Sequence, residues 1–323
     1  MKTTEVLHAW GRILSGRAPS LSIEITRECP LSCPGCYAYN DDHLNTGLTL
    51  RQVRDFRGPA LVEGVVALVE KHKPLHLSIV GGDPLVRLFE LEELLPRLTA
   101  MGVHCQVVTS AFRKIPSHWK ENPRVSVVVS IDGLEADHDV RRKPATYERI
   151  LRNIADARVT VHCTVTRQMT GRPGYLKQFM EFWAPRPEIS KVWMSIYTPQ
   201  RGEVSSERLR PQDRAAVVAD LLELRSRFPK LDMPKGLIEA YLTPPSSPAE
   251  CTFAKTTQTI SADLQTMITP CQFGGNPDCS QCGCIASAGL HAIKKHKIGG
   301  VIPIGAIYDA SSRIGDTVAR LRT

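Results

Sequence analysis

A regular alternation of short apolar runs with longer amphipathic segments between residues 21 and 200 constrains this chain more than any other feature. Runs rich in Val, Ile and Thr are typical of buried strands, and apolar residues three or four positions apart are typical of helices. Strands are predicted over Leu21–Thr26, Leu75–Val80, His104–Thr109, Val125–Ile131, Val159–Thr166 and Val192–Tyr197. Helices are predicted over residues 4–15, Leu50–Lys71, Leu88–Met101, Tyr147–Asp156 and Tyr175–Trp183. Six β-α units in series predict an α/β fold with parallel strands and right-handed crossovers.

Such a series forms either an open doubly wound sheet or a full or partial barrel, and both bind ligands at the carboxyl ends of the strands. The series ends at two Pro/Ser-rich stretches, Thr198–Pro211 and Thr243–Pro248, with a predicted helix over Ala215–Arg227 between them. The predicted divisions are an N-terminal helical extension at 1–20, a core at 21–200, a helical linker region at 201–250, a cysteine-rich module at 251–300 and a C-terminal tail at 301–323.

The composition is that of an ordinary globular protein, with 42% hydrophobic and 23% charged residues. The formal charge of +8 comes from scattered basic residues, which indicates a solvated positive surface and no nucleic-acid partner. No apolar run resembles a signal peptide or a membrane span, so we expect a cytoplasmic protein. In that reducing compartment, ten cysteines favour metal binding or catalysis over disulfides.

Three of these cysteines, Cys29, Cys33 and Cys36, form a C-x3-C-x2-C array directly after the first predicted strand. Structural zinc requires four protein ligands, and disulfides would leave one of the three unpaired. A [4Fe–4S] cluster normally takes four cysteines, so a cluster held by three keeps one iron open to an external ligand. The array therefore favours a cluster that binds its substrate or cofactor directly.

With this spacing on this loop, the sequence resembles the radical S-adenosylmethionine (SAM) superfamily. The resemblance implies a partial (β/α)6 TIM-like barrel and a [4Fe–4S] cluster whose open iron binds the amino and carboxylate groups of SAM. It further implies that a reductant such as flavodoxin or ferredoxin supplies the electron that cleaves SAM. The resulting 5′-deoxyadenosyl radical abstracts hydrogen from a substrate. Many members carry an aromatic residue before the third cysteine, where this chain has Gly35, so Tyr37 becomes the candidate neighbour of the adenine.

The second predicted strand ends in Gly81, Gly82, Asp83 and Pro84. Paired glycines allow close approach of a ligand to the backbone, and a carboxylate suits an ammonium group, although the pair can also form a simple turn. The stretch resembles the GGEP element of the family, with Asp83 in place of Glu. The resemblance implies a contact with the amino group of SAM.

The fourth strand runs into IDGLEADHDVRR, which resembles the SLDG…HDxxR stretch of members that carry extra C-terminal clusters. By that resemblance Ser130 and Arg142 are candidate contacts of the SAM carboxylate or ribose, and a guanidinium suits a carboxylate well. Asp132 and His138 are predicted either to act on substrate or to serve as a turn carboxylate and a histidine at a helix start. Isolated Cys105 and Cys163 are predicted to be small core residues.

The last five cysteines fall within a compact module and are Cys251, Cys271, Cys279, Cys282 and Cys284. Alternating Thr/Ile runs between the first two predict a β-hairpin that brings those two together, and a helix is predicted from Ile285 to about His296. The arrangement resembles the SPASM or twitch auxiliary modules, which implies a second [4Fe–4S] cluster. A zinc ribbon has similar spacing. We expect Cys279 and Cys282 to complete the ligand set, with Cys284 as a spare or an exchanging ligand.

These features predict a radical SAM enzyme that acts on a peptide side chain or a small metabolite, assisted by the auxiliary cluster. The alternative is a non-catalytic iron–sulfur electron carrier or a zinc-stabilised binding protein. A carrier would supply four protein ligands to each cluster, and no fourth cysteine lies near Cys36.

Overall fold

The computed structural model describes residues 3–144, 146–298 and 301–321, and its centre is one parallel sheet of seven strands. The order is β6-β5-β4-β3-β2-β1-β7, so each of the first six strands lies beside the next one in the chain. The strands are β1 (Ser20–Glu24), β2 (His76–Val80), β3 (His104–Thr109), β4 (Val125–Ser130), β5 (Val159–Val165), β6 (Ile189–Ile196) and β7 (Thr257–Ile260). This order is that of a partial (β/α)6 barrel, and the six strands predicted from the alternating pattern are confirmed.

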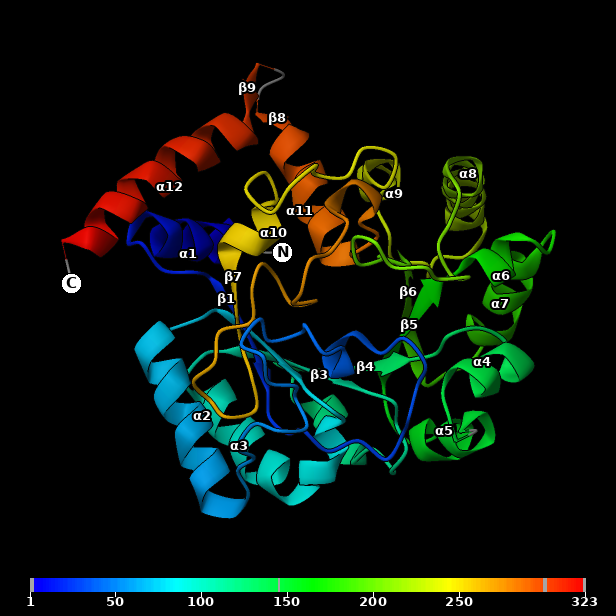
Figure 1. Ribbon diagram of the computed structural model, residues 1–323, viewed down its shortest axis with the longest axis horizontal. Helices are drawn as coiled ribbons and strands as arrows, with labels where there is room; N and C mark the ends of the chain where they lie inside the picture. The colour runs from blue at the N-terminus through cyan, green and yellow to red at the C-terminus, as the bar shows by residue number, and fades with distance from the viewer. Residues whose placement is uncertain (1–2, 145, 299–300, 322–323) are drawn as a thin grey trace.

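Helices surround the curved sheet, except the last one, which packs against the first helix instead (Figure 1). They are α1 (Thr3–Leu14), α2 (Gly58–His72), α3 (Leu88–Ala100), α4 (Glu135–Arg141), α5 (Tyr147–Ile154), α6 (Arg167–Thr170), α7 (Tyr175–Trp183), α8 (Pro211–Arg227), α9 (Lys235–Ala240), α10 (Thr252–Thr256), α11 (Ile285–Lys295) and α12 (Ile304–Arg320). Alternate strand residues such as Leu21 and Ile23 pack with helix residues such as Leu61 in one apolar core. Residues between them, such as Ser22 and Glu24, are polar, and they give the opposite face of the sheet its polar character.

Helix α2 begins at Gly58, eight residues later than the predicted start at Leu50. The preceding segment cannot continue the helix because other side chains bind its carbonyl groups. Arg27 donates to the carbonyl oxygens of Arg51 and Val53, and Arg87 donates to that of Phe56. A helix start placed by periodicity alone therefore extended too far toward the N-terminus.

The predicted hairpin between Cys251 and Cys271 was wrong in most of its length. Its first arm starts as helix α10 and continues as β7, which pairs in parallel with β1 in the main sheet. Only the tip turns back as predicted, where Ile260 forms an antiparallel bridge with Met267. The exposed edge of β1 supplies the reason, because its unpaired backbone groups are satisfied by β7.

The chain ends on helix α12, which lies beside α1 (Figure 1). The indole nitrogen of Trp10 donates to Ser311 Oγ at 3.0 Å, and Gly16 approaches Gly315 so closely that a side chain on either would clash. The predicted division had assigned this region only as a tail. The predicted limits at residues 1, 300 and 323 lie outside the described residues. None of the helices in the described ranges has the length and apolar character needed to cross a bilayer.

Candidate cofactor site

The cysteine loop, residues 25–36, follows the carboxyl end of β1 and carries Cys29, Cys33 and Cys36. The three thiols are partly exposed, and charge on Cys33 and Cys36 acts on the thiol of Cys29. Burial raises the pKa of Cys29 to about 12 and also raises the pKa of Cys33. A bound cationic metal centre offsets that effect of burial and lets such thiols act as thiolate ligands. The loop thus carries three sulfur donors that act on one another within one short segment.

The glycine pair after β2 packs directly against the cysteine loop. Gly81 has a left-handed φ of +136°, and the amide of Gly82 donates to the carbonyl oxygen of Thr26 at 2.8 Å. A Cβ on Gly82 would lie 2.0 Å from the carbonyl oxygen of Glu28. Close approach therefore does require glycine here, and the group approached is the backbone just before Cys29.

The carboxylate of Asp83 is buried and fully engaged within the protein. It accepts hydrogen bonds from the amides of Leu85 and Ser110 and from the hydroxyls of Thr109 and Ser110, at 2.5 to 3.0 Å. Burial raises its pKa against the opposing effect of these bonds. Asp83 therefore joins the ends of β2 and β3, and sequence analysis had assigned no role to the Thr109–Ser110 turn. The sequence did offer one signal for this contact: Thr109 and Ser110 are hydroxyl residues at the end of the strand next to the one that leads into Asp83.

The end of β4 carries a buried ionic network. Asp132 is fully buried and pairs with Arg141 and, at 2.8 Å, with Arg142. Burial alone would raise the pKa of Asp132, but the two guanidinium groups hold it far below its usual range. Arg141 also pairs with Glu207, at 2.6 Å. These contacts make Asp132 a structural anchor for the two arginines.

Arg142 and Ser130, the two predicted contacts of SAM near β4, lie in different surroundings. The charge of Arg142 acts on the thiol of Cys33, which places this guanidinium beside the cysteine loop. Ser130 ends β4 and is nearly buried. His138 is buried as well: it accepts from the amide of Asp132 at 3.1 Å and contacts Thr146 Oγ1 at 3.1 Å. Burial lowers the pKa of His138 to about 4, so this histidine is neutral at pH 7.

A second set of thiols lines a small, partly open site at the same rim. This site, the thiol cavity, is lined by the five late cysteines, Cys251, Cys271, Cys279, Cys282 and Cys284. Phe253 and Phe273 supply apolar walls, and the described lining residues include no carboxylate or imidazole. The amide of Ile196, at the end of β6, donates to the carbonyl of Gly283 at 3.0 Å. The C-terminal module is thereby held at the carboxyl ends of the strands.

The five thiols act on one another, and charge on Cys271 and Cys282 acts on Cys284 as well. The Cys271 thiol is affected by charge on Cys251, Cys279 and Cys282, and burial raises its pKa to about 12. Cys279 is affected by Cys251 and Cys282, and burial raises its pKa to about 11. Cys284 is more deeply buried, receives a contact from Gln272 Nε2 at 3.5 Å and acts on Tyr37. All-sulfur donors in a mostly apolar cavity suit a soft metal centre such as an iron–sulfur cluster.

No three His, Cys, Asp or Glu side chains in the described ranges converge closely enough to hold a single metal ion. The ligand sets considered below therefore rest on which thiols share one loop or one cavity.

A model of the radical SAM superfamily matches residues 23–182, which include the cysteine loop and the ends of β2 and β4. The chain belongs to the radical SAM superfamily. The span matched to this superfamily contains both Cys29–Cys36 and Arg142. No curated protein sequence matches the chain.

Solved structures share the radical SAM fold of this chain. Streptococcus suis SuiB bound to the precursor peptide SuiA matches with 13% identity over 88% of this chain and 67% of SuiB, at a TM-score of 0.59. Native anSMEcpe with bound AdoMet matches with 16% identity over 83% of this chain and 80% of that one, at a TM-score of 0.57. The same protein with AdoMet and the Cp18Cys peptide gives a TM-score of 0.54 at 16% identity over 83% and 79%. The chain spans about two-thirds of the length of SuiB.

Tyr37 lies between the two thiol sites of this radical SAM protein. The centre of its ring lies 5.2 Å from that of Phe273, in an edge-on contact, and 5.7 Å from that of His43. Charge on Cys36, Cys271 and Cys284 acts on its hydroxyl group. The predicted neighbour of the adenine therefore also contacts the C-terminal module. Its position after Cys36 was visible in the sequence, but its contact with Phe273 was not.

A buried pair that sequence analysis missed reinforces this junction. His43 Nε2 contacts Glu24 Oε1 at 2.8 Å, and His43 Nδ1 contacts the carbonyl oxygen of Phe273 at 3.0 Å. Ser261 donates to the other oxygen of Glu24 at 2.9 Å. Burial alone would lower the pKa of His43, but Glu24 raises it above the usual value. The pair ties β1, the cysteine loop and the module together.

Proposed function

We propose that this radical SAM enzyme modifies a peptide side chain and uses a second [4Fe–4S] cluster in the thiol cavity. The observation that carries the proposal is that two separate groups of thiols, one of three and one of five, lie at the same rim of the barrel. Active sites of such barrels form at this rim.

Cys29, Cys33 and Cys36 hold the SAM-binding cluster, because they are the three thiols of one loop and leave one iron without a protein ligand. The cluster and SAM together supply the 5′-deoxyadenosyl radical that abstracts hydrogen. Arg142, beside Cys33, is suited to the carboxylate of SAM, and Ser130 lies at the end of the same strand. Tyr37 contributes an aromatic face next to Cys36.

The glycine turn serves the same ligand through its backbone. Because Asp83 already accepts four hydrogen bonds, we assign the contact with the SAM amino group to carbonyl oxygens around Gly81, Gly82 and Pro84. Asp83 then acts as a positioning residue that fixes this turn between β2 and β3. A direct contact between the Asp83 carboxylate and the amino group of SAM remains a prediction from the resemblance to the GGEP element.

The auxiliary cluster takes Cys251, Cys271, Cys279 and Cys282 as ligands, since these thiols share the cavity and Cys279 and Cys282 have the C-x2-C spacing that lets two thiols reach one metal centre. Tyr37 and Cys284 lie between this cluster and the cysteine loop. A second redox centre beside the substrate can accept the electron that a substrate radical must lose to become an oxidised product. The alternative occupant is zinc in a structural site.

A peptide substrate is favoured because SuiB and anSMEcpe, which share the fold, were each solved with a peptide. A small metabolite remains the second candidate. A flavodoxin or ferredoxin is the expected electron donor. A cytoplasmic location agrees with ten reduced thiols in the described part of the chain.

The test is anaerobic reconstitution with iron and sulfide, followed by incubation with SAM and dithionite. We expect about eight irons per chain and formation of 5′-deoxyadenosine. Iron binding without 5′-deoxyadenosine would indicate an electron carrier, and tightly bound zinc in the thiol cavity would indicate a structural module. Hydrogen transfer from deuterated candidate peptides into 5′-deoxyadenosine then identifies the substrate class.

A further inference from the structure

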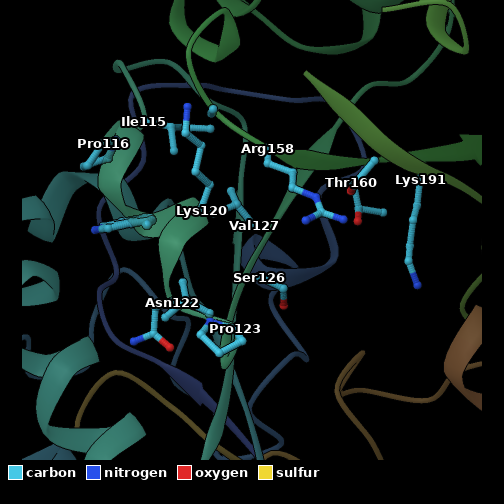
Figure 2. A pocket seen from close by; sticks show the side chains of 14 residues that line it. Ile115, Pro116, Lys120, Asn122, Pro123, Ser126, Val127, Arg158, Thr160 and Lys191 are labelled. Carbon is cyan, nitrogen blue, oxygen red and sulfur yellow. The ribbon is translucent and has the colours of Figure 1, made fainter. Parts of the chain in front are cut away.

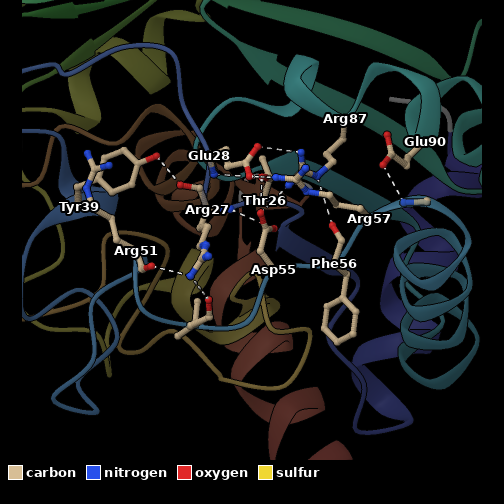
Figure 3. Close-up of polar contacts among 12 residues, drawn as sticks. Thr26, Arg27, Glu28, Tyr39, Arg51, Asp55, Phe56, Arg57, Arg87 and Glu90 are labelled. Atoms are coloured by element: carbon tan, nitrogen blue, oxygen red, sulfur yellow. Dashed lines mark hydrogen bonds and ion pairs between the residues drawn. The ribbon is translucent and has the colours of Figure 1, made fainter.

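An arginine segment, residues 51–57, is fastened to the backbone that leads into Cys29. Arg27 Nη1 donates to the carbonyl oxygens of Arg51 and Val53 at 2.7 and 3.0 Å. Arg87 pairs with Asp55 at 2.5 Å and with Glu28 at 3.1 Å, which ties the segment to the residue before Cys29. Figure 3 shows these residues in one continuous set of polar contacts. The segment therefore forms part of the protein surface beside the cysteine loop.

This surface is strongly positive. Arg51, Arg54 and Arg57 are all exposed, whereas Asp55 is only 6% exposed and is occupied by Arg87. Glu28 is shared between Arg57 and Arg87. Five arginines, including Arg27, thus face the carboxylates of Glu28 and Asp55 and that of Glu90, which accepts from the amide of Gly58, and this leaves two net positive charges on the patch. Exposed Asp41 and Asp42 lie on the next turn of the chain, where the carbonyl of Asp42 approaches Gly275 of the C-terminal module.

Two of the exposed arginines are ordered by aromatic rings. The guanidinium of Arg51 lies 4.0 Å from the centre of the Tyr39 ring, and that of Arg54 lies 4.4 Å from the centre of the Phe56 ring. Such contacts hold a cation over an aromatic face while leaving it accessible to solvent. The arginines consequently present fixed charges to an approaching partner.

Tyr39 connects this surface to the thiols. Its hydroxyl donates to the carbonyl oxygen of Arg27 at 2.8 Å, and charge on Cys29 and Cys36 acts on its phenol. An electron donor bound over Arg51 would therefore lie beside the loop that holds the SAM-binding cluster. That closeness matters because reductive cleavage of SAM needs one electron from outside the chain.

We propose that Arg51, Arg54 and Arg57 form the docking surface for an acidic one-electron donor protein of the flavodoxin kind. This inference rests on the proposed function, since it supposes a cluster at Cys29, Cys33 and Cys36. One electron leaves the reduced flavin of the donor and enters the cluster, and no atom is transferred. Opposite charges steer such encounters and set their orientation, with a strong dependence on salt.

A second group of cations offers a matched control. Lys120, Arg158 and Lys191 line a cavity of about 390 Å³ at the amino ends of β4, β5 and β6 (Figure 2). In a parallel sheet this end is opposite to the one that carries the cysteine loop. Removing these three cations changes the net charge as much as removing the arginines, but at a surface far from the thiols.

The experiment measures the Kd of an oxidised acidic flavodoxin for the reconstituted protein by titration of flavin fluorescence at low salt. Arg51→Gln/Arg54→Gln/Arg57→Gln is expected to raise Kd about tenfold and to flatten its salt dependence. Arg51→Lys/Arg54→Lys/Arg57→Lys should keep the parent Kd within about threefold, because these substitutions preserve the charge. Lys120→Gln/Arg158→Gln/Lys191→Gln should leave Kd within about twofold of the parent.

Turnover separates this proposal from the proposed function. With dithionite as reductant, the arginine triple should form 5′-deoxyadenosine at the parent rate, and with reduced flavodoxin it should be slower. An unchanged Kd in that triple, or an equal weakening in the remote triple, overturns the docking surface. If the triple Arg→Gln variant loses iron, the single variant Arg54→Glu is measured in its place, and its Kd must rise several-fold. A parent that binds flavodoxin but makes no 5′-deoxyadenosine with dithionite overturns the proposed function instead.

Discussion

The cysteine loop and the thiol cavity each bring together thiols that could hold a metal centre, but they do so in different ways. The loop brings three thiols together within eight residues of sequence, and these thiols remain partly exposed. The cavity gathers five thiols from separate turns of the chain, of which Cys251 and Cys284 are buried and the other three are partly exposed. A local site of three leaves room for an external ligand, whereas a site that supplies four protein ligands suits a centre that only exchanges electrons.

This difference also sets what each site requires of the fold. The loop depends on its own spacing and on the glycine turn that packs beneath it at Gly82. The cavity depends on contacts that are distant in sequence, such as the bond between Ile196 and Gly283. We therefore expect damage to the loop to abolish chemistry, and damage to the cavity to remove iron while SAM cleavage persists.

The largest expected effect is at the loop. Cys29→Ala, Cys33→Ala or Cys36→Ala should each reduce 5′-deoxyadenosine formation with dithionite to background, because two thiols cannot retain the cluster with an open iron. The measurement is single-turnover product formation by chromatography on reconstituted protein. Cys105→Ala is the control, since Cys105 is a buried core thiol remote from both sites. A loop variant as active as the parent would disprove the assignment.

The second prediction tests the cavity. Cys271→Ala or Cys279→Ala should lower iron from about eight to about four per chain, while 5′-deoxyadenosine still forms with dithionite at a rate within about threefold of the parent. The reason is that each substitution removes one of the four proposed ligands of the auxiliary cluster, whereas the cysteine loop is intact. Loss of SAM cleavage together with the iron would mean that the two sites are not independent. Iron assay and chromatography on the same samples decide between these results.

The third prediction concerns the rim between the sites. Arg142→Ala should weaken SAM binding by about ten- to a hundredfold with iron content unchanged, because a charge-assisted contact with the SAM carboxylate is lost. Ser130→Ala should weaken it by a few-fold, as expected for one neutral hydrogen bond. Equilibrium dialysis with labelled SAM gives both numbers, and Arg158→Ala at the far end of the barrel is the control. Parent affinity in both variants would remove these residues from the site.

The alternating pattern predicted the barrel well because buried parallel strands and amphipathic helices each leave a local periodic trace. The start of α2 was misplaced because Arg27 and Arg87 bind the carbonyls of the preceding segment, and no local pattern records that. The parallel pairing of β7 was missed for the same kind of reason, since its partner β1 lies more than two hundred residues earlier. The three thiols of the loop were found by spacing alone, but their roles remain predictions.

Polar contacts between distant elements were the least predictable part of the site. Asp83 was expected to face a ligand, yet its carboxylate joins β2 to β3 through Thr109 and Ser110. Gly283 likewise makes a close contact that no local pattern records, since a Cβ there would lie 2.0 Å from the carbonyl oxygen of Ile196. In both cases the residue type was correct for a close contact, and only the partner could not be deduced.

The smallest expected effect is at Cys284, the one cavity thiol that we do not assign as a ligand of the auxiliary cluster. Cys284 precedes helix α11, is almost fully buried and is contacted by Gln272, and it lies outside the C-x2-C pair of Cys279 and Cys282. Cys284→Ser should therefore retain about eight irons per chain and the parent rate of SAM cleavage within about twofold, in contrast to Cys279→Ala. Iron quantification in a background that also lacks Cys29, Cys33 and Cys36 isolates the cavity. A full auxiliary cluster in Cys279→Ala with loss in Cys284→Ser would exchange the two residues in the ligand set.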